Sequence, residues 1–159
     1  MAVKGKKPGF SKLIAKNKKA FFDYEVLDKM EAGIILTGPE VKSAKDGRVQ
    51  LKGAFVKMRQ KKVVVENLHI SAYRYSNVAE YNPLRVRELL LTKSEIEIIA
   101  AKTEEKGLTV VPLELNLKNN LVKLTIGICR GKKLHDKRDV LKKKAITRDV
   151  QAGLKKLSR

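Results

Sequence analysis

The chain has 159 residues, 43% of them hydrophobic, which fits one domain with a buried core. Its 36 Lys and Arg against 17 Asp and Glu give a net charge of +19, which indicates a polyanionic partner, either nucleic acid or an anionic membrane surface. One cysteine and two histidines exclude a disulfide framework and a cysteine-based zinc site, and the short apolar runs exclude a membrane-spanning helix. Because no apolar segment typical of a secretory signal follows the basic N-terminus, we expect a cytoplasmic protein.

The positive charge is concentrated at the two ends of the chain. Residues 1–19 contain seven Lys and no acidic residue, residues 20–129 carry a net charge of only +3, and residues 130–159 carry +9. We therefore expect a flexible basic arm over 1–19, a folded domain over 20–129 and a basic tail over 130–159. We expect these basic ends to become ordered when they bind a phosphate backbone. The alternative is that they serve only to keep the protein soluble.

The first half of the chain contains four predicted strands, of which 21–29 is rich in aromatic and β-branched residues and 49–59 alternates. These predicted strands cover residues 21–29, 33–37, 49–59 and 63–70. Gln60-Lys61-Lys62 is a plausible hairpin turn between the last two strands, and Pro39 opens a short predicted helix over 40–45. Residues 71–84 lack periodicity and are expected to be irregular.

The second half opens with the clearest helix signal. Thr92 and Glu95 have the spacing of a capping box, and Gly107 ends the helix that follows. Strands are predicted over 108–118 and 121–129 around an Asn119-Asn120 turn, with Pro112 marking an edge position or a bulge. Many short strands with hairpin turns and one good helix predict a mainly β fold, an antiparallel β-barrel with flanking helices and disordered basic tails.

The tail over 130–159 has a different character. Its apolar residues fall near helical spacing among many basic residues. The spacing predicts a conditional helix that is unstable alone and forms on a partner. His135 lies within a basic stretch over 131–138, where a flat ring between cations suits stacking on RNA.

Nothing in the sequence indicates catalysis. There is no glycine-rich phosphate loop, no zinc-protease motif and no nucleophile elbow, so we expect neither an enzyme nor a cofactor nor a metal site. Cys129 is most simply a small buried hydrophobe. Basic and aromatic residues alternate in Tyr73-Arg74-Tyr75 and around Tyr81, where the rings either stack on exposed bases or pack a loop onto the barrel.

Several short sequence motifs, taken in order along the chain, are similar to those of a known family. They are Glu31-Ala32-Gly33, Gly38-x-Glu40-Val41-Lys42-Ser43, Asn67-Leu68-His69-Ile70, Asn82-Pro83-x-Arg85-x-Arg87-x-Leu89-Leu90-Leu91, Gly107-x-Thr109-Val110-Val111-Pro112-Leu113 and Gly131-Lys132-Lys133-x-His135-Asp136-Lys137-Arg138. The chain from about Asn17 to about Arg138 thus resembles the small protein B family, the bacterial partner of transfer-messenger RNA in trans-translation. Several motifs that occur in the same order identify a family more specifically than any single motif does.

The resemblance implies a fold, partners and site residues. The fold would be an oligonucleotide-binding-type β-barrel that binds the tRNA-like domain of transfer-messenger RNA and delivers it to stalled ribosomes. Its RNA-facing positions would be Glu31, Leu90 and Thr92, where the family often carries Asn or His in place of Thr92. The further RNA-binding candidates in the matched motifs are Lys42, Lys132 and Lys133. The ribosome-engaging tail would use Asp136, Lys137 and Arg138, with His135 stacking on small-subunit ribosomal RNA.

Two rival interpretations stay open at this point. Another ribosome-binding or structured-RNA-binding protein would lack selectivity for transfer-messenger RNA over bulk tRNA. A membrane-surface protein would use the tail as an amphipathic helix, against which stands the absence of Trp and Phe from that tail. Our leading hypothesis is an RNA-binding adaptor for ribosome rescue that acts as a monomer on the RNA, without a membrane partner.

Overall fold

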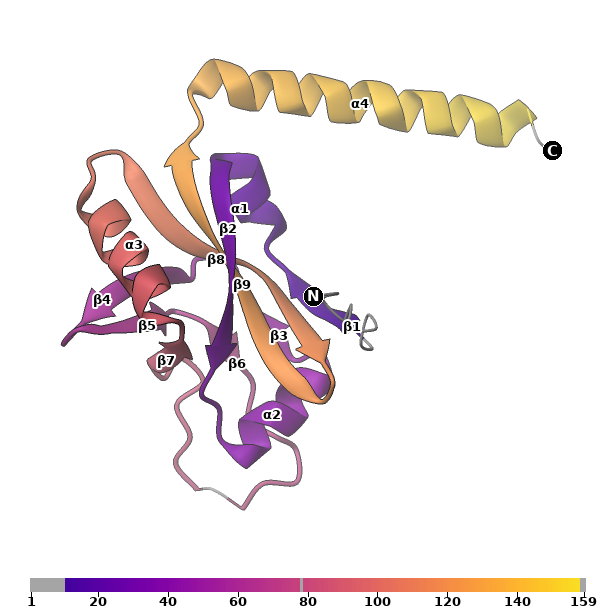
Figure 1. The fold of residues 1–159 in the computed structure, drawn as a ribbon. Coiled ribbons are helices and arrows are strands. Elements are labelled where there is room, and N and C mark those ends of the chain that lie inside the picture. The colour runs from indigo at the N-terminus through magenta and orange to yellow at the C-terminus, as the bar shows by residue number, and fades with distance from the viewer. Residues whose placement is uncertain (1–10, 78, 158–159) are drawn as a thin grey trace, which may run out of the picture.

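The computed structural model describes residues 11–77 and 79–157 and is mainly β with flanking helices (Figure 1). Nine strands and four helices follow one another along this part of the chain. The strands are β1 (Ser11–Lys16), β2 (Tyr24–Ile34), β3 (Val49–Gln50), β4 (Phe55–Arg59), β5 (Lys62–Glu66), β6 (His69–Ile70), β7 (Arg87–Leu90), β8 (Leu108–Lys118) and β9 (Leu121–Gly131). The helices are α1 (Lys18–Asp23), α2 (Gly38–Lys45), α3 (Lys93–Glu104) and α4 (Leu134–Leu157).

The main sheet closes on itself. Its strands are hydrogen-bonded in the order β1-β8-β4-β5-β7-β2-β9, and β9 also pairs with β8, so that β8, β4, β5, β7, β2 and β9 form a ring. Every pairing in the ring is antiparallel. The alternate residues that face inward make the main core, which includes Val65, Leu115, Leu124 and Ile126. The predicted class, mainly β with flanking helices, is therefore confirmed.

Both predicted hairpin turns are present. Gln60 and Lys61 join β4 to β5 with φ of 49° and 64°, and Asn119 and Asn120 join β8 to β9 with the same two values. Positive φ at two consecutive residues is the geometry of a type I′ turn, whose twist matches that of the strands it connects. Asparagine tolerates this region well, which explains why two residues were sufficient to predict the second turn.

Pro112 marks a bulge within the ring. The register of β8 against β9 shifts between Pro112 and Glu114, and β8 also pairs with β1 and β4 on its other side. Since proline has no N–H to give to a ladder, a bulge lets the strand continue around it. The predicted bulge at Pro112 is thus present, and on the other side of β8 the pairings with β1 and β4 stop at Glu114 and Val110.

The N-terminal segment is more ordered than the sequence predicts. Residues 1–10 lie outside the described part, but Ser11–Lys16 pairs with β8 as strand β1, where the sequence predicts a flexible arm. Helix α1 then occupies Lys18–Asp23, so the strand predicted over 21–29 begins only at Tyr24. The cause is Asn17, whose side chain caps α1 and donates to the carbonyls of Leu51 and Pro112. These partners are distant in sequence, so a local pattern does not reveal them.

Other boundaries also differ from the sequence-based expectation. Strand β2 runs without interruption to Ile34, and the two strands predicted over 49–59 and 63–70 are each divided into two short ones. Left-handed residues cause the divisions, with Gly53 at φ 80° before β4 and Asn67 at φ 57° after β5. Strand β7 falls in a segment to which the sequence analysis assigned no element. The predicted helices from Pro39 and Thr92 are both confirmed, each with a capping box.

A second, smaller core lies on the outer surface of the ring. Helix α1 packs there through Ala20 and Phe21 against Val111, Leu113 and Cys129 of strands β8 and β9. The strand β9 continues to Gly131, two residues past the expected end of the folded domain. Beyond it, α4 is the helix that the spacing of the tail predicts, and it projects away from the body (Figure 1). Whether this helix depends on a partner stays a prediction.

Candidate nucleic-acid interface

The outer face of β2 carries the first candidate residue, Glu31. Met30 and Ala32 point into the main core, so Lys29, Glu31 and Gly33 point outward. Glu31 is exposed and forms an ion pair with Lys118 at the end of β8, 87 residues away in sequence. The carboxylate is accessible to a ligand and is held in place by a neighbouring cation, an arrangement in which it can accept hydrogen bonds from base N–H or ribose hydroxyl groups.

Leu90, the second candidate, lies on the same outer face as Glu31. It is 56% exposed and stands opposite Gly33 in the pairing of β7 with β2. A Cβ at Gly33 would come within 3.2 Å of the Leu90 Cβ, so the glycine makes room for the leucine to lie flat over the strand. The structure therefore brings Glu31 and Leu90 together as a small apolar platform next to a carboxylate.

Thr92, the third candidate, caps the N-terminus of α3. Its hydroxyl accepts a hydrogen bond from the Glu95 backbone N–H at 3.3 Å, and its own N–H donates to the Glu95 carboxylate at 2.9 Å. The predicted capping role is confirmed. Thr92 is also exposed two residues after Leu90, so the hydroxyl lies close to the platform, and its contact with RNA stays a prediction.

Lys42 belongs to a separate surface on α2. Its ammonium lies 5.5 Å from the centre of the Tyr73 ring, and Tyr73 makes an edge-to-face contact with Tyr75 at 5.6 Å. Tyr75 is 76% exposed, which suits stacking on a base. Tyr81, by contrast, is a packing residue, because its hydroxyl donates to the Ile70 carbonyl at 2.9 Å and accepts from Arg87. The packing alternative thus applies to Tyr81, and stacking of Tyr75 on a base stays a prediction.

A buried ionic network holds this end of the molecule together. Glu40 and Arg87 have fully buried side chains and form an ion pair, and Arg85 donates twice to the same carboxylate, at 2.6 and 3.1 Å. Arg87 also donates to the carbonyls of Leu68 and Pro83 at 2.6 and 3.1 Å. Burial alone would raise the pKa of Glu40, but the hydrogen bonds from Arg87 and Arg85 outweigh it and hold this pKa below its ordinary value.

The basic segment after β9 is tied to α1. The Lys132 backbone N–H donates to the Asp23 carbonyl at 2.9 Å, and its ammonium donates to the Phe21 carbonyl at 3.0 Å. Lys137, in the first turns of α4, forms an ion pair with the Asp23 carboxylate at 3.3 Å. Burial would raise the pKa of Asp23, but its bonds to Lys19 and Lys137 lower it overall.

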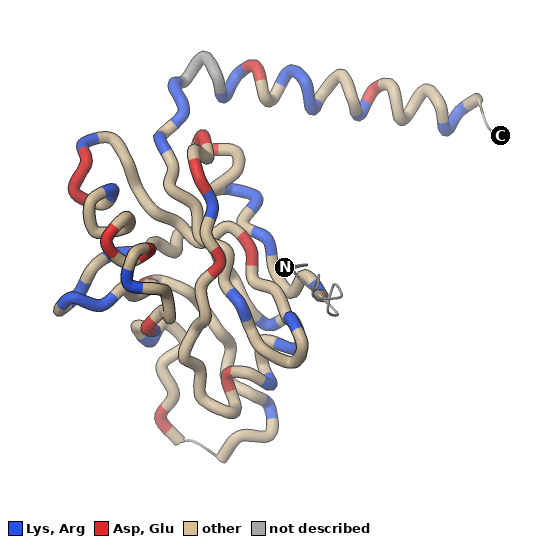
Figure 2. The backbone as a smooth tube through the Cα atoms, viewed as in Figure 1, with Lys and Arg blue, Asp and Glu red and all other residues tan. Residues whose placement is uncertain are grey.

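The other tail candidates differ in how they are placed. Lys133 and Arg138 are exposed and available to a partner. The side chains of His135 and Asp136 lie outside the described part of the structure, so their predicted roles stay predictions. Figure 2 shows basic residues recurring along α4 and its connection to β9, whereas acidic and basic residues are interspersed over the body. Helix α2, which contains Lys42, and the start of α4 lie at opposite ends of the molecule (Figure 1).

Metal binding, membrane crossing and thiol reactivity can each be examined in the described residues. The described residues contain no group of three or more His, Cys, Asp and Glu side chains that could bind a metal ion. None of the helices in 11–77 and 79–157 combines the length and hydropathy that crossing a bilayer requires. Cys129 is fully buried, and burial raises the pKa of its thiol to about 11, which leaves it unreactive.

The fold and these surfaces define a small, strongly basic β protein with a polar outer face and a projecting basic helix. The chain belongs to the SmpB protein family, whose model matches residues 14–156. The SsrA-binding protein of Treponema denticola is 49% identical over 91% of this chain and 94% of its own length. The SsrA-binding protein of Enterococcus hirae is 43% identical over 95% of this chain and 98% of its own.

A solved structure is also similar. It is described as "tmRNA-SmpB: a journey to the center of the bacterial ribosome", and the matching chain has a TM-score of 0.64 and 39% sequence identity. The match covers 80% of this chain and 87% of the other. Sequence and fold thus agree on the family that the resemblance predicts.

Proposed function

We propose that this protein is an RNA-binding adaptor that binds the tRNA-like domain of transfer-messenger RNA and delivers it to stalled ribosomes for trans-translation. The observation that carries the proposal is family membership along nearly the whole chain, with relatives named SsrA-binding proteins and a solved relative described as tmRNA-SmpB in the bacterial ribosome. A protein with these partners acts in the cytoplasm.

The outer face of the ring would bind the RNA head. Leu90 offers an apolar contact for a ribose or base, and Glu31 accepts hydrogen bonds beside it, while surrounding lysines neutralise phosphates. We infer that the closed ring is an oligonucleotide-binding-type barrel, which uses one face of its sheet in this way. Thr92 would extend this contact, whereas Lys42 at one end of the protein and Lys132 and Lys133 at the other would contact the RNA at separate points. The protein would bind as a monomer.

Helix α4 and the residues at its start would engage the ribosome. The helix carries many cations and exposes its apolar residues, so it has both the charge and the shape to lie along ribosomal RNA. In this scheme His135 stacks on small-subunit ribosomal RNA, and Asp136, Lys137 and Arg138 fix the helix there. The protein makes and breaks no covalent bond and needs no cofactor.

The platform is tested with Leu90→Asp, measured as affinity for the tRNA-like domain of transfer-messenger RNA. Ile98→Asp on α3 is the matched control, because Ile98 is also an exposed apolar residue, 43% accessible, away from the platform. We expect Leu90→Asp to weaken binding at least tenfold with unchanged thermal unfolding, because it places a charge against the RNA. Equal affinities of the two variants would contradict the assigned face, and equal parental affinity for bulk tRNA would favour a general RNA-binding protein instead.

The tail is tested by truncation after Lys133, which keeps β9 intact. The truncated protein should still bind the RNA head, but peptide tagging on a message without a stop codon should fail in a reconstituted translation system. Simultaneous substitution of Asp136, Lys137 and Arg138 by alanine should reproduce much of that failure. Normal tagging by the truncated protein would refute the proposed role of α4.

A further inference from the structure

Two lysines converge on one aromatic ring beside the candidate interface. The ammonium of Lys16, at the end of β1, lies 4.9 Å from the centre of the Phe21 ring, and that of Lys29, on β2, lies 5.5 Å from it. The two positive charges are therefore no further apart than the sum of these distances. The ring attracts both cations, so it holds them in place although they repel each other.

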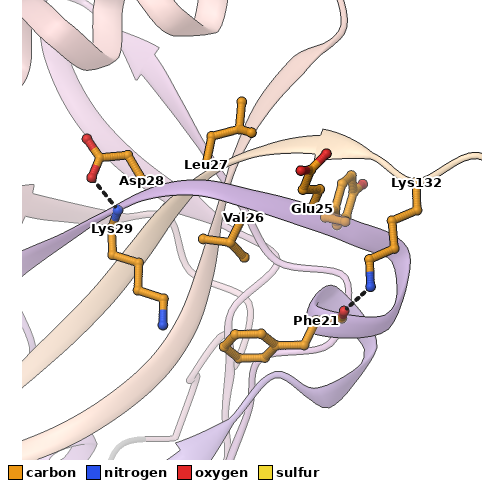
Figure 3. A pocket seen from close by; sticks show the side chains of 8 residues that line it. Phe21, Glu25, Val26, Leu27, Asp28, Lys29 and Lys132 are labelled. Atoms are coloured by element: carbon orange, nitrogen blue, oxygen red, sulfur yellow. Dashed lines mark hydrogen bonds between the residues drawn. The ribbon is translucent and has the colours of Figure 1, made fainter. Parts of the chain in front are cut away.

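Among the described side chains, no carboxylate oxygen lies within 4.0 Å of the ammonium nitrogen of Lys16 or Lys29. Glu114 stands opposite Lys16 in the β1–β8 register but makes no ion pair with it. Asp28 accepts a hydrogen bond from the Lys29 backbone N–H at 2.8 Å, and Figure 3 shows it pointing away from Phe21 while Lys29 points toward it. Among the described residues, no carboxylate therefore forms an ion pair with either of these two cations.

Lys29 and Phe21 line a groove of about 680 Å³ that β2 and α1 form together with Lys132 (Figure 3), and Lys16 approaches the same Phe21 ring from β1. The Lys132 ammonium is fixed on the Phe21 carbonyl, so three cations surround this aromatic residue. Lys29 also shares the outer face of β2 with Glu31, two residues or about 7 Å further along. An RNA strand that contacts Glu31 and Leu90 needs only to continue along β2 to reach the groove.

We propose that Lys16 and Lys29, held over Phe21, form a cradle for a backbone phosphate of the same RNA; this site rests on the proposed function. A phosphate fits better than a base, because two ammonium groups lie within 5.5 Å of the ring centre and attract an anion. The phosphate oxygens would accept hydrogen bonds from both ammonium groups and remove their mutual repulsion. Phe21 positions the two lysines and is not itself a contact to the RNA.

The test compares two double variants of the full chain with the same net charge. Lys16→Gln with Lys29→Gln removes the cradle, whereas Lys61→Gln with Lys106→Gln removes two exposed lysines at the β4–β5 turn and after α3, for which no ion pair is seen among the described residues. The affinity for the tRNA-like domain is measured as a function of salt concentration. Each phosphate contact contributes about 0.7–0.9 to the slope of log affinity against log salt.

We expect the cradle variant to lower that slope by about 0.7–0.9, the contribution of one phosphate, and the control variant to leave it near the parental value. Phe21→Leu should lower the slope by part of this amount, because leucine fills the small core but attracts no cation. Equal slopes for the cradle and control variants would overturn the proposal. Failure of the proposed function would be distinguishable, because the parent protein would then bind the tRNA-like domain no better than bulk tRNA, whichever slopes the variants show.

Discussion

Replacing Glu40 by Gln tests whether the buried ionic network stabilises the fold. The substitution keeps the size of the side chain but leaves the Arg87 guanidinium, which is fully buried, without its counter-charge. Removing one partner of a buried ion pair costs about 3–5 kcal/mol in free energy of unfolding. Arg85→Gln is the matched comparison, because the Arg85 side chain is 40% exposed and its loss leaves Glu40 still paired with Arg87, at a cost of about 1 kcal/mol.

The pH dependence of the same variant gives an independent test. The pKa of Glu40 is lowered in the folded protein, so this group contributes stability above its unfolded pKa and loses it as the pH falls through the folded value. The parent therefore loses the charge in acid, and the difference between parent and Glu40→Gln should shrink below about pH 4. Urea unfolding at pH 7 and at pH 3.5 measures both quantities. A Glu40→Gln cost no larger than that of Arg85→Gln, or one independent of pH, would refute this account.

Three further results are expected. Gly127→Ala should cost about 1–3 kcal/mol in urea unfolding, because its Cβ would lie 2.6 Å from Leu113 Cδ1, whereas Gly131→Ala, which meets nothing within 4 Å, should be close to neutral. Cys129 should not react with a thiol reagent at pH 8 until the protein unfolds, since burial raises its pKa to about 11; rapid labelling of the native protein would contradict this. Asp23→Asn should accelerate amide hydrogen exchange in the first turns of α4, because the carboxylate that binds Lys137 is lost, and unchanged exchange would show that the ion pair does not hold the helix.

Local signals in the sequence were sufficient for the elements that depend on neighbouring residues. The Asn119-Asn120 turn and the Thr92 capping box each need only a few adjacent residues, and both are present as predicted. Helix α1 is different, because its Phe-rich sequence favours a strand and its cap, Asn17, is fixed by carbonyls 34 and 95 residues away. Long-range contacts of this kind override local propensity.

In the candidate site, too, some residues could be predicted from the sequence and others depend on long-range contacts. The resemblance selected Glu31 and Leu90, and the structure brings them to one face, but Lys118 was missed because it comes from the far end of another strand. Lys29 was also missed, although a signal was available, since alternation around the buried Ala32 places Lys29 and Glu31 on the same side. The partnership of Lys16 with Phe21 depends on the packing of α1, which the sequence did not reveal.

Two contacts between the first half of α4 and α1 give this helix the mechanics of a lever. The Lys137–Asp23 ion pair and the Lys144 ammonium, 5.6 Å from the Phe22 ring, both fall in the first eleven residues of the helix. A helix of 24 residues is about 36 Å long, so a tilt of about 10° at its base moves the far end by about 6 Å. Any partner that displaces Asp23 or Phe22 would therefore redirect the whole tail, and small changes on α1 would be read out as large changes in where the C-terminal cations point.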